Sequence, residues 1–306
     1  MTAVFELTEV AFTCGAGVTA LAGVDLTIHQ GERVALLGAN GSGKSTLLHL
    51  LGGLVQPTGG EIRAFGAPLT AELLRDEARA QAFRRRVGIV FQNADAQLFS
   101  PTVRDEIAFG PLHLGLRQGE AQQRVDDMVR LLGLEALVER APYKLSGGEQ
   151  KKVALAAVLA IDPDVLLIDE PMSGLDPRTR QWLLEFLEAL HVAGKTLVVA
   201  THDLAELERL VDRVVILGED HRLAAAGPVS EMLGDRALLL SVNLIHEHTH
   251  VHGTLVHSHP HAHPPGHEHG AEHDHAQPHA HAHEAHGHEH AHPHGGTDAG
   301  TGPGGE

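Results

Sequence analysis

The chain has 306 residues, 42% of them apolar, and 23 Lys and Arg against 40 Asp and Glu give a formal net charge of −17. This composition is sufficient for a large buried core, and the acidic balance excludes a broad nucleic-acid-binding surface, because such surfaces are basic. The single cysteine, Cys14, excludes an internal disulfide and is typical of a reducing compartment. We expect no signal peptide and no membrane span, since no apolar run approaches about 20 residues.

The first part of the chain predicts three strands. Residues 4–10 and 23–29 alternate apolar and polar side chains, and residues 33–37 form an aliphatic run. We expect the first two strands to pack with the third in one sheet.

A glycine-rich loop follows the third strand and fits the pattern G-x-x-x-x-G-K-[ST]. Its glycines let backbone N–H groups turn toward one point, where the N-terminus of the next helix adds about half a positive charge. A triphosphate suits this point, with Lys44 reaching the β- and γ-phosphates and the Ser45 hydroxyl binding Mg²⁺. A chance match is the alternative, but the flanking strand and apolar helix argue against it. The predicted ATP-binding residues of the loop are Gly38, Asn40, Gly41, Ser42, Gly43, Lys44, Ser45 and Thr46.

Another short strand and a charged helical stretch come next. Residues 61–65 predict the strand, residues 69–86 predict the helical stretch, and residues 87–91 resume as an apolar strand. Gln92 follows that strand directly. An amide at the end of a buried strand can touch Mg²⁺ or an attacking water, although a strand-end cap is an equally good interpretation of the spacing.

A helical insert is predicted over residues 102–140, with breaks at Gly110–Pro111 and Gly115. The segment Leu145-Ser146-Gly147-Gly148-Glu149-Gln150 follows, and then an Ala- and Leu-rich helix at residues 153–160. Ser146 can cap that helix, which would create a second anion site of the same kind as the glycine-rich loop. Alone, Ser-Gly-Gly-Glu is weak evidence, since it also makes an ordinary loop and cap.

Two carboxylates follow a continuous apolar run at residues 165–168, which is typical of a central parallel strand covered on both faces. Buried carboxylates are costly without a partner, and here Asp169 can hold Mg²⁺ while Glu170 accepts a proton from an attacking water. His202 comes just after the next buried strand. Ligands of open α/β sheets bind at the carboxyl ends of the strands, so we expect these three side chains, the glycine-rich loop and Gln92 to converge there.

These motifs, in this order, resemble the ATP-binding subunit of an ABC transporter. The resemblance implies an α/β P-loop NTPase fold with a mixed sheet core of parallel strands, an antiparallel β subdomain and a helical subdomain. It also implies a head-to-tail dimer with ATP between the glycine-rich loop of one copy and the segment Ser146, Gly147, Gly148 and Glu149 of the other. Asp176 would belong to a loop that links the two sites.

The same resemblance implies a role for each residue at the sheet edge. Asp169 would help to bind Mg²⁺, and Glu170 would polarise the attacking water. His202 would steady the γ-phosphate. Gln92 would contact Mg²⁺ and couple the site to a membrane partner.

A finer resemblance lies in Val90–Phe99, Thr102–Val103, Ala108–Pro111 and Lys151–Ala154. These segments are similar to the cobalt/nickel branch of the energy-coupling-factor importers. That branch implies a membrane coupling subunit, a substrate-binding membrane subunit and a peripheral location at the cytoplasmic face of the membrane. The same segments occur in the vitamin-importing branch, so they indicate the family more than the cargo.

One position departs from the family pattern. Cys14 stands where the family usually has an aromatic ring that stacks on adenine. Phe12 is a candidate to stack on adenine in its place, although its position in the alternating pattern of the strand favours a side chain in the core. The affinity and base selectivity of the site therefore depend on another contact.

The composition changes abruptly at His246, and 20 of the chain's 26 histidines lie beyond residue 245. This tail, residues 246–306, has too little apolar surface to offset its ordering entropy, so we expect disorder. Imidazole binds Ni²⁺, Co²⁺, Zn²⁺ and Cu²⁺, which predicts a metal-binding tail with little selectivity; a solubilising tail is the alternative. The predicted tail ligands are His246, His248, His250, His252, His257, His259, His261 and His263.

The sequence thus predicts an ABC ATP-binding domain at residues 1–235 with a helical insert at about 93–160, a linker at 236–245 and the tail. The predicted function is ATP hydrolysis that drives Ni²⁺ or Co²⁺ uptake through separate membrane subunits, with a second ATPase copy or a paralogue and without nucleic acid. The alternatives are a vitamin or other cargo, or a soluble non-transport ABC ATPase with a metal-storage tail. A nickel-loading P-loop metallochaperone would share the histidines but lacks the signature at 145–150.

Overall fold

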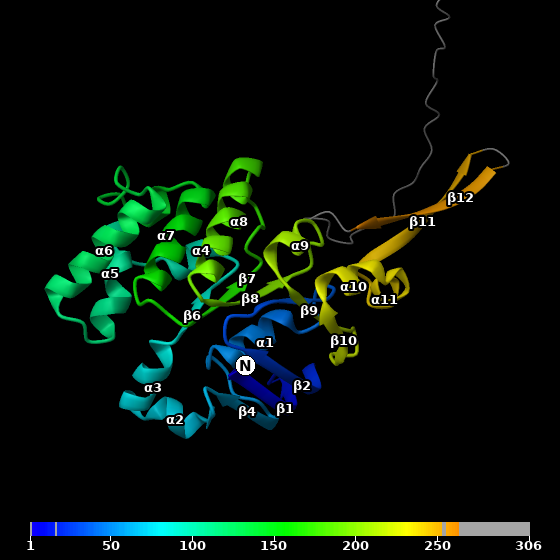
Figure 1. The fold of residues 1–306 in the computed structure, drawn as a ribbon, viewed down its shortest axis with the longest axis horizontal. Coiled ribbons are helices and arrows are strands. Elements are labelled where there is room, and N and C mark those ends of the chain that lie inside the picture. Colours follow the sequence, from blue (N-terminus) through cyan, green and yellow to red (C-terminus); the bar gives the residue numbers. More distant parts are fainter. Residues whose placement is uncertain (1, 16, 253–254, 263–306) are drawn as a thin grey trace, which may run out of the picture. The chain divides into compact units, whose positions relative to one another are not determined.

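The computed structural model describes residues 2–15, 17–252 and 255–262 (Figure 1). An antiparallel sheet of order β2-β1-β4-β5 forms the N-terminal layer. Its strands are β1 (Ala3–Thr13), β2 (Thr19–His29), β4 (Gly59–Ala64) and β5 (Ala67–Pro68). The expectation that the strand at residues 33–37 joins β1 and β2 is wrong, because that strand pairs with parallel partners in a second sheet.

The second sheet has the order β10-β9-β3-β8-β7-β6. All its neighbours pair in parallel except β10, which is antiparallel to β9. The strands are β3 (Arg33–Leu37), β6 (Val87–Val90), β7 (Val165–Asp169), β8 (Thr196–Thr201), β9 (Arg213–Leu217) and β10 (Leu223–Pro228). The mixed sheet core and the separate antiparallel layer confirm the predicted fold class.

Alternating residues of this sheet supply two different cores, because successive side chains of a strand point to opposite faces. Leu167 of β7 packs in a core with the leucines of α1 (Lys44–Leu51) and the antiparallel sheet. Its neighbours Leu166 and Ile168 pack in a second core with α7 (Gly147–Leu159) and α8 (Pro177–Val192). Burial on both faces explains why these strands read as continuous apolar runs.

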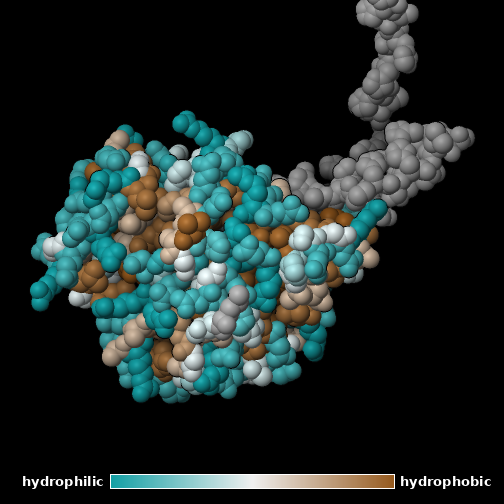
Figure 2. All heavy atoms as spheres, in the orientation of Figure 1, coloured by the Kyte–Doolittle hydropathy of each residue, from teal (hydrophilic) through white to brown (hydrophobic). Residues whose placement is uncertain are grey.

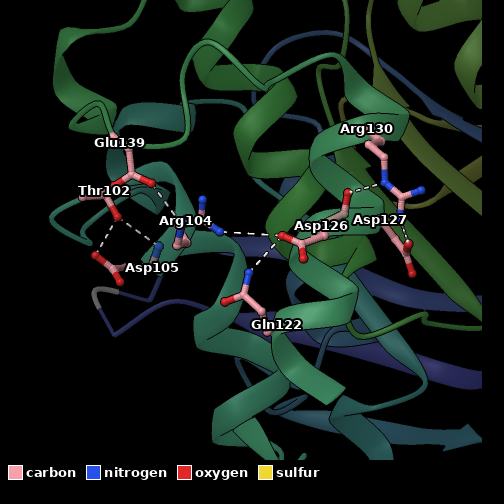
Figure 3. Close-up of polar contacts among 8 residues, drawn as sticks. All are labelled: Thr102, Arg104, Asp105, Gln122, Asp126, Asp127, Arg130 and Glu139. Atoms are coloured by element: carbon pink, nitrogen blue, oxygen red, sulfur yellow. Dashed lines mark hydrogen bonds and ion pairs between the residues drawn. The ribbon is translucent and has the colours of Figure 1, made fainter. Parts of the chain in front are cut away.

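Helices between β6 and β7 form a layer with a core of its own. They are α4 (Ala94–Gln97), α5 (Val103–His113), α6 (Gln118–Leu132) and α7, with a 3₁₀ turn at Pro142–Lys144. Arg104 of α5 fastens this layer at its surface, with ion pairs of 3.7 Å to Asp126 and 3.1 Å to Glu139 (Figure 3). Figure 2 shows apolar surface among hydrophilic side chains where Figure 1 labels α4, α7 and α8.

The expected break at Gly110–Pro111 does not occur, since α5 continues through both residues to His113. Pro111 lies in the last turn, so it removes one backbone hydrogen bond only near the end of the helix. Gly110 faces α7 so closely that an added Cβ would lie 3.1 Å from Ile161 and 3.5 Å from the carbonyl oxygen of Ala157. The glycine therefore serves close helix packing, and the helix ends before Gly115.

The remaining helices of the described part are short. They are α2 (Ala71–Arg75), α3 (Glu77–Arg84), α9 (Leu207–Leu210), α10 (Val229–Gly234) and α11 (Arg236–Ser241). The predicted linker at residues 236–245 is wrong, because it contains α11 and buries Leu239, Val242 and Leu244 in the second core. Across the described ranges, no helix combines the length and apolarity needed to cross a bilayer.

The first part of the tail, for which the sequence predicts disorder, contains two strands. Strands β11 (Ile245–His252) and β12 (Leu255–Ala262) pair antiparallel. In β11, the β-branched residues Thr249 and Val251 stand between histidines, and such residues favour extended structure. Residues 263–306, including the predicted ligand His263, lie outside the described residues.

Candidate active site

The sheet topology brings the predicted motifs to one edge. Strands β3, β6, β7 and β8 run parallel, so their carboxyl ends lie together. The glycine-rich loop follows β3, and Gln92 follows β6. Asp169 is the last residue of β7 and Glu170 comes next, while His202 follows β8. The Gln92 side chain is exposed there.

The glycine-rich loop depends on backbone conformations that other residues rarely adopt. The φ angles of Gly41 and Gly43 are 84° and 105°. A Cβ on Gly43 would collide with the carbonyl oxygen of Ala20, and a Cβ on Gly38 would lie 2.7 Å from that of Leu217. The loop therefore fits closely between its neighbours and leads directly into the N-terminus of α1, whose first residue is Lys44.

Lys44 is buried at this edge. Its Nζ donates hydrogen bonds of 2.8 Å to the Gly38 carbonyl and 3.1 Å to the Ala39 carbonyl. Burial lowers the pKa of Lys44, while the charges of Glu170 and Asp169 oppose that shift. The ammonium thus lies between the loop backbone and the two carboxylates, where it can exchange carbonyl oxygens for the oxygens of an anion.

Asp169 has the features of a cation ligand. Its side chain is buried, and its Oδ1 has no hydrogen-bond partner among the described residues. Burial raises the pKa of Asp169, while a hydrogen bond with Ser45 opposes the shift. The buried Ser42 Oγ is also without a partner in the structure. Buried polar atoms without partners are uncommon, and carboxylate and hydroxyl oxygens are the donors that Mg²⁺ prefers. Asp169 and Ser45 therefore fit a magnesium ion.

Glu170 is held by both of its oxygens. Thr201 Oγ1 donates a hydrogen bond of 3.1 Å to Oε2, and His202 Nδ1 lies 2.7 Å from Oε1. Glu170 also has a φ of 43°, a backbone conformation that is strained for a residue with a side chain. The carboxylate raises the pKa of His202. The arrangement orients a carboxylate beside a phosphate-type loop, which is the geometry of a general base for a water.

Sequence comparison decides the family. The profile described as ABC transporter matches residues 21–173, which is half of the chain. The chain belongs to the ABC transporter ATP-binding family, and it is an ATPase.

Relatives and solved structures agree with this family. The nickel import ATP-binding protein NikO of Rhodobacter capsulatus is 52% identical over 248 residues, which cover 80% of this chain and 97% of that protein. CbiO1 of Clostridium perfringens, described as part of the ABC transporter complex CbiONQ, is 33% identical with a TM-score of 0.68 over 80% of this chain and 96% of its own. A dimeric ATP-binding cassette in a post-hydrolysis state with ADP and phosphate has a TM-score of 0.65 at 29% identity, over 74% of this chain and 98% of its own.

The ABC signature lies on a different element from the glycine-rich loop. Ser146 caps α7 and forms a capping box with Glu149, whose Oε2 accepts a hydrogen bond of 2.8 Å from the Ser146 backbone. Gly147 and Gly148 form the first turn of that helix. No hydrogen bond or ion pair joins these residues to the loop in the described part of the chain. The N-terminus of α7 is thus prepared as an anion site, separate from the loop of the same copy.

Asp176 has a local structural role. It caps α8 by accepting hydrogen bonds of 3.0 Å and 3.1 Å from the backbone of Arg178 and Thr179. These bonds and the Thr179 hydroxyl lower the pKa of Asp176. They fix the loop at the start of α8, so the direction in which that loop leaves β7 is well defined.

Sequence reasoning did not anticipate the position of Lys151. This residue follows the signature, is only 4% exposed, and directs Nζ to the Gln92 backbone carbonyl at 3.4 Å. Burial lowers its pKa to about 8, while Asp169 and Glu170 oppose the shift. Lysine is rarely buried without a partner. The helical periodicity of this segment does not indicate which of the neighbouring residues Lys151 and Lys152 points into the core. Lys151 connects α7 to the segment after β6.

Glu106 was also missed as a positioning residue. It is 4% exposed and its Oε2 accepts hydrogen bonds of 2.9 Å from the Phe99 backbone and 2.7 Å from that of Ser100. A buried carboxylate that accepts two backbone N–H groups fixes a loop. Glu106 thereby holds the segment that carries the exposed Phe99.

Replacing Lys151 with Met should reduce the ATP turnover number by about threefold to tenfold, the kinetic equivalent of one ordinary net hydrogen bond. The variant loses the hydrogen bond that positions Gln92, and Met retains most of the buried stem. Lys152→Met is the matched control, because that ammonium lies over the Trp182 ring at 4.5 Å. Steady-state phosphate release measures the turnover number of both variants. If the two variants turn over ATP equally fast, Lys151 does not position the site.

Proposed function

We propose that this chain is the ATP-hydrolysing subunit of an energy-coupling-factor importer, and that it drives uptake of Ni²⁺ or Co²⁺ through separate membrane subunits. The observation that carries the ATPase is the Glu170 carboxylate, held by His202 beside Asp169 and the glycine-rich loop. The cargo is supported by the 52% identity to the nickel import protein NikO. The chain would act at the cytoplasmic face of the membrane as a peripheral subunit.

The residues at the sheet edge divide the work of hydrolysis. Asp169, Ser45 and Gln92 would hold Mg²⁺, which supplies charge neutralisation for the phosphate oxygens. Lys44 would exchange its bonds to the loop carbonyls for bonds to the β- and γ-phosphates. Glu170 would orient the attacking water, and His202 would hold Glu170 in place and contact the γ-phosphate.

A second copy or a paralogue would complete the site. Gly147 and Gly148 form the first turn of α7, where backbone N–H groups have no partner within the helix, and an anion fits such a turn. No hydrogen bond or ion pair joins this turn to the glycine-rich loop of the same copy within the described residues. ATP between two copies would use both anion sites, with Asp176 fixing the loop between them.

The helical layer offers a surface for the membrane partner. Phe99, Phe109 and Leu112 are exposed on it, at 66%, 47% and 46%. The Phe99 and Phe109 rings pack edge to face with centroids 4.8 Å apart. Exposed aromatic side chains of this kind favour a protein contact. A membrane coupling subunit bound here would contact the same layer that Lys151 connects to Gln92.

Uptake of radiolabelled Ni²⁺ and Co²⁺ tests the cargo. Cells that express this chain with the membrane subunits should accumulate one of these metals, and the Glu170→Gln variant should abolish the accumulation. ATPase activity is measured in parallel on the purified complex. An active ATPase without metal uptake would contradict the metal cargo and favour a vitamin or another substrate.

The histidine-rich tail would bind the same class of metal. Imidazole suits Ni²⁺, Co²⁺ and Zn²⁺, and the tail supplies many imidazoles near the side to which an importer delivers. Among the described residues, no group of three His, Cys, Asp or Glu side chains is placed to hold a metal ion, so metal binding by the tail is proposed from its histidine content. The tail would therefore act as a local store or sensor for the imported ion.

A further inference from the structure

Strands β11 and β12 pair in a register that sets histidine opposite histidine. His246 faces His261, His248 faces His259, and His250 faces His257. The positions between them pair differently: Glu247 with Pro260, Thr249 with Ser258, and Val251 with Val256. Every histidine of these pairs thus occupies the same parity of the hairpin, and no histidine occupies the other parity.

Antiparallel pairing gives this register a chemical meaning. Residues two apart on a strand belong to one face, and directly facing residues have Cβ atoms about 4.5–5.5 Å apart. Facing positions of this kind allow two imidazoles to share one ion, and the neighbouring pair is about 7–8 Å away along the diagonal. A shift of one residue in either direction would leave no histidine of one strand opposite a histidine of the other.

We propose that the β11–β12 hairpin is a transition-metal site built from facing histidine pairs, with the pairs 248/259 and 250/257 at its centre. This proposal rests on the proposed metal-binding role of the tail. It adds that defined histidine pairs of the hairpin bind the ion, and not an unstructured set of histidines. The ligand class is a divalent ion that prefers imidazole: Ni²⁺, Co²⁺, Zn²⁺ or Cu²⁺. The intervening Thr and Val residues favour the extended strands that hold the register.

Three permuted full-length variants test the register at constant composition. The first exchanges neighbours in β11: His248→Thr, Thr249→His, His250→Val and Val251→His. The second does the same in β12: Val256→His, His257→Val, Ser258→His and His259→Ser. The third combines all eight substitutions. Each single-strand variant keeps the number of histidines and removes the facing pairs 248/259 and 250/257 while 246/261 stays, whereas the combined variant recreates two facing pairs at 249/258 and 251/256.

Ni²⁺ binding is measured by competition with a chromophoric chelator, at less than one equivalent of metal so that the tightest site is reported. Each single-strand variant should bind about tenfold more weakly, a difference of about 1.4 kcal/mol, and the combined variant should recover the wild-type affinity. ATPase activity, which does not involve the hairpin, should stay unchanged in all three and confirms the fold.

The outcomes separate this proposal from the proposed function. Equal affinity in all four proteins would overturn the facing-pair site and leave a composition-based chelator. Failure of the combined variant to recover would overturn it as well. Deletion of residues 246–306 is the reference: if the truncated chain binds Ni²⁺ as tightly as the full chain, metal binding by the tail itself is wrong.

Discussion

Replacing Glu170 with Gln should reduce the ATP turnover number by at least about 100-fold, the range usual for removal of a general base. The amide keeps the shape and can still bond to Thr201 and His202, so the loss reflects proton acceptance and charge, not packing. ATP should still bind, because the residues that hold phosphate are unchanged. The pKa of His202 should fall toward its ordinary value, since the Glu170 carboxylate raises it.

Steady-state phosphate release measures the turnover number, equilibrium binding measures the affinity for ATP, and NMR titration follows His202. Glu208→Gln is the matched control, because it makes the same chemical change at an exposed position of α9. Retention of more than about a tenth of the wild-type turnover would assign the base to another residue.

Replacing Gly43 with Ala should weaken ATP binding on the order of 100-fold, from backbone strain of about 1–3 kcal/mol together with a steric collision. The φ of 105° disfavours any side chain, and the new Cβ would meet the Ala20 carbonyl and lie 2.8 Å from Leu21 Cδ2. Relief of the collision must displace the loop from β2, which misplaces the backbone N–H groups that bind phosphate. Equilibrium binding of ATP checks this result.

Gly31→Ala is the matched control for this change. Gly31 has a φ of 78°, but no heavy atom of the described residues, apart from its two chain neighbours, lies within 4 Å of the position that its Cβ would take. That variant should lower the melting temperature slightly and leave ATP affinity unchanged. If both variants bind ATP equally well, the close fit of the loop against β2 is not required for binding.

Much of the site could be predicted because its signals are local. Residues 33–37 and 165–168 are continuous aliphatic runs, and the structure has strands at both places. Polar residues directly after such strands meet at one edge once the strands are parallel, which places Gln92 and His202 near Asp169.

Features that depend on distant partners could not be predicted in this way. The sequence of β3 does not reveal that its partners are β8 and β9, since pairing is decided by residues far along the chain. The inward turn of Lys151 depends on the carbonyl of Gln92, which is contributed by another segment. Composition also does not indicate the β11–β12 pairing, because a register between two segments depends on both of them.

The close approach of α5 to α7 at Gly110 has a mechanical consequence. With no side chain between them, the two helices have little freedom to slide, so they should respond to force as one stiff body. Ser146 is at one end of this body and the exposed Phe109 belongs to the other helix. If a nucleotide displaces Ser146, Phe109 should therefore move by nearly the same distance. The two helices would in this way couple the ATP site to the partner that binds the aromatic surface.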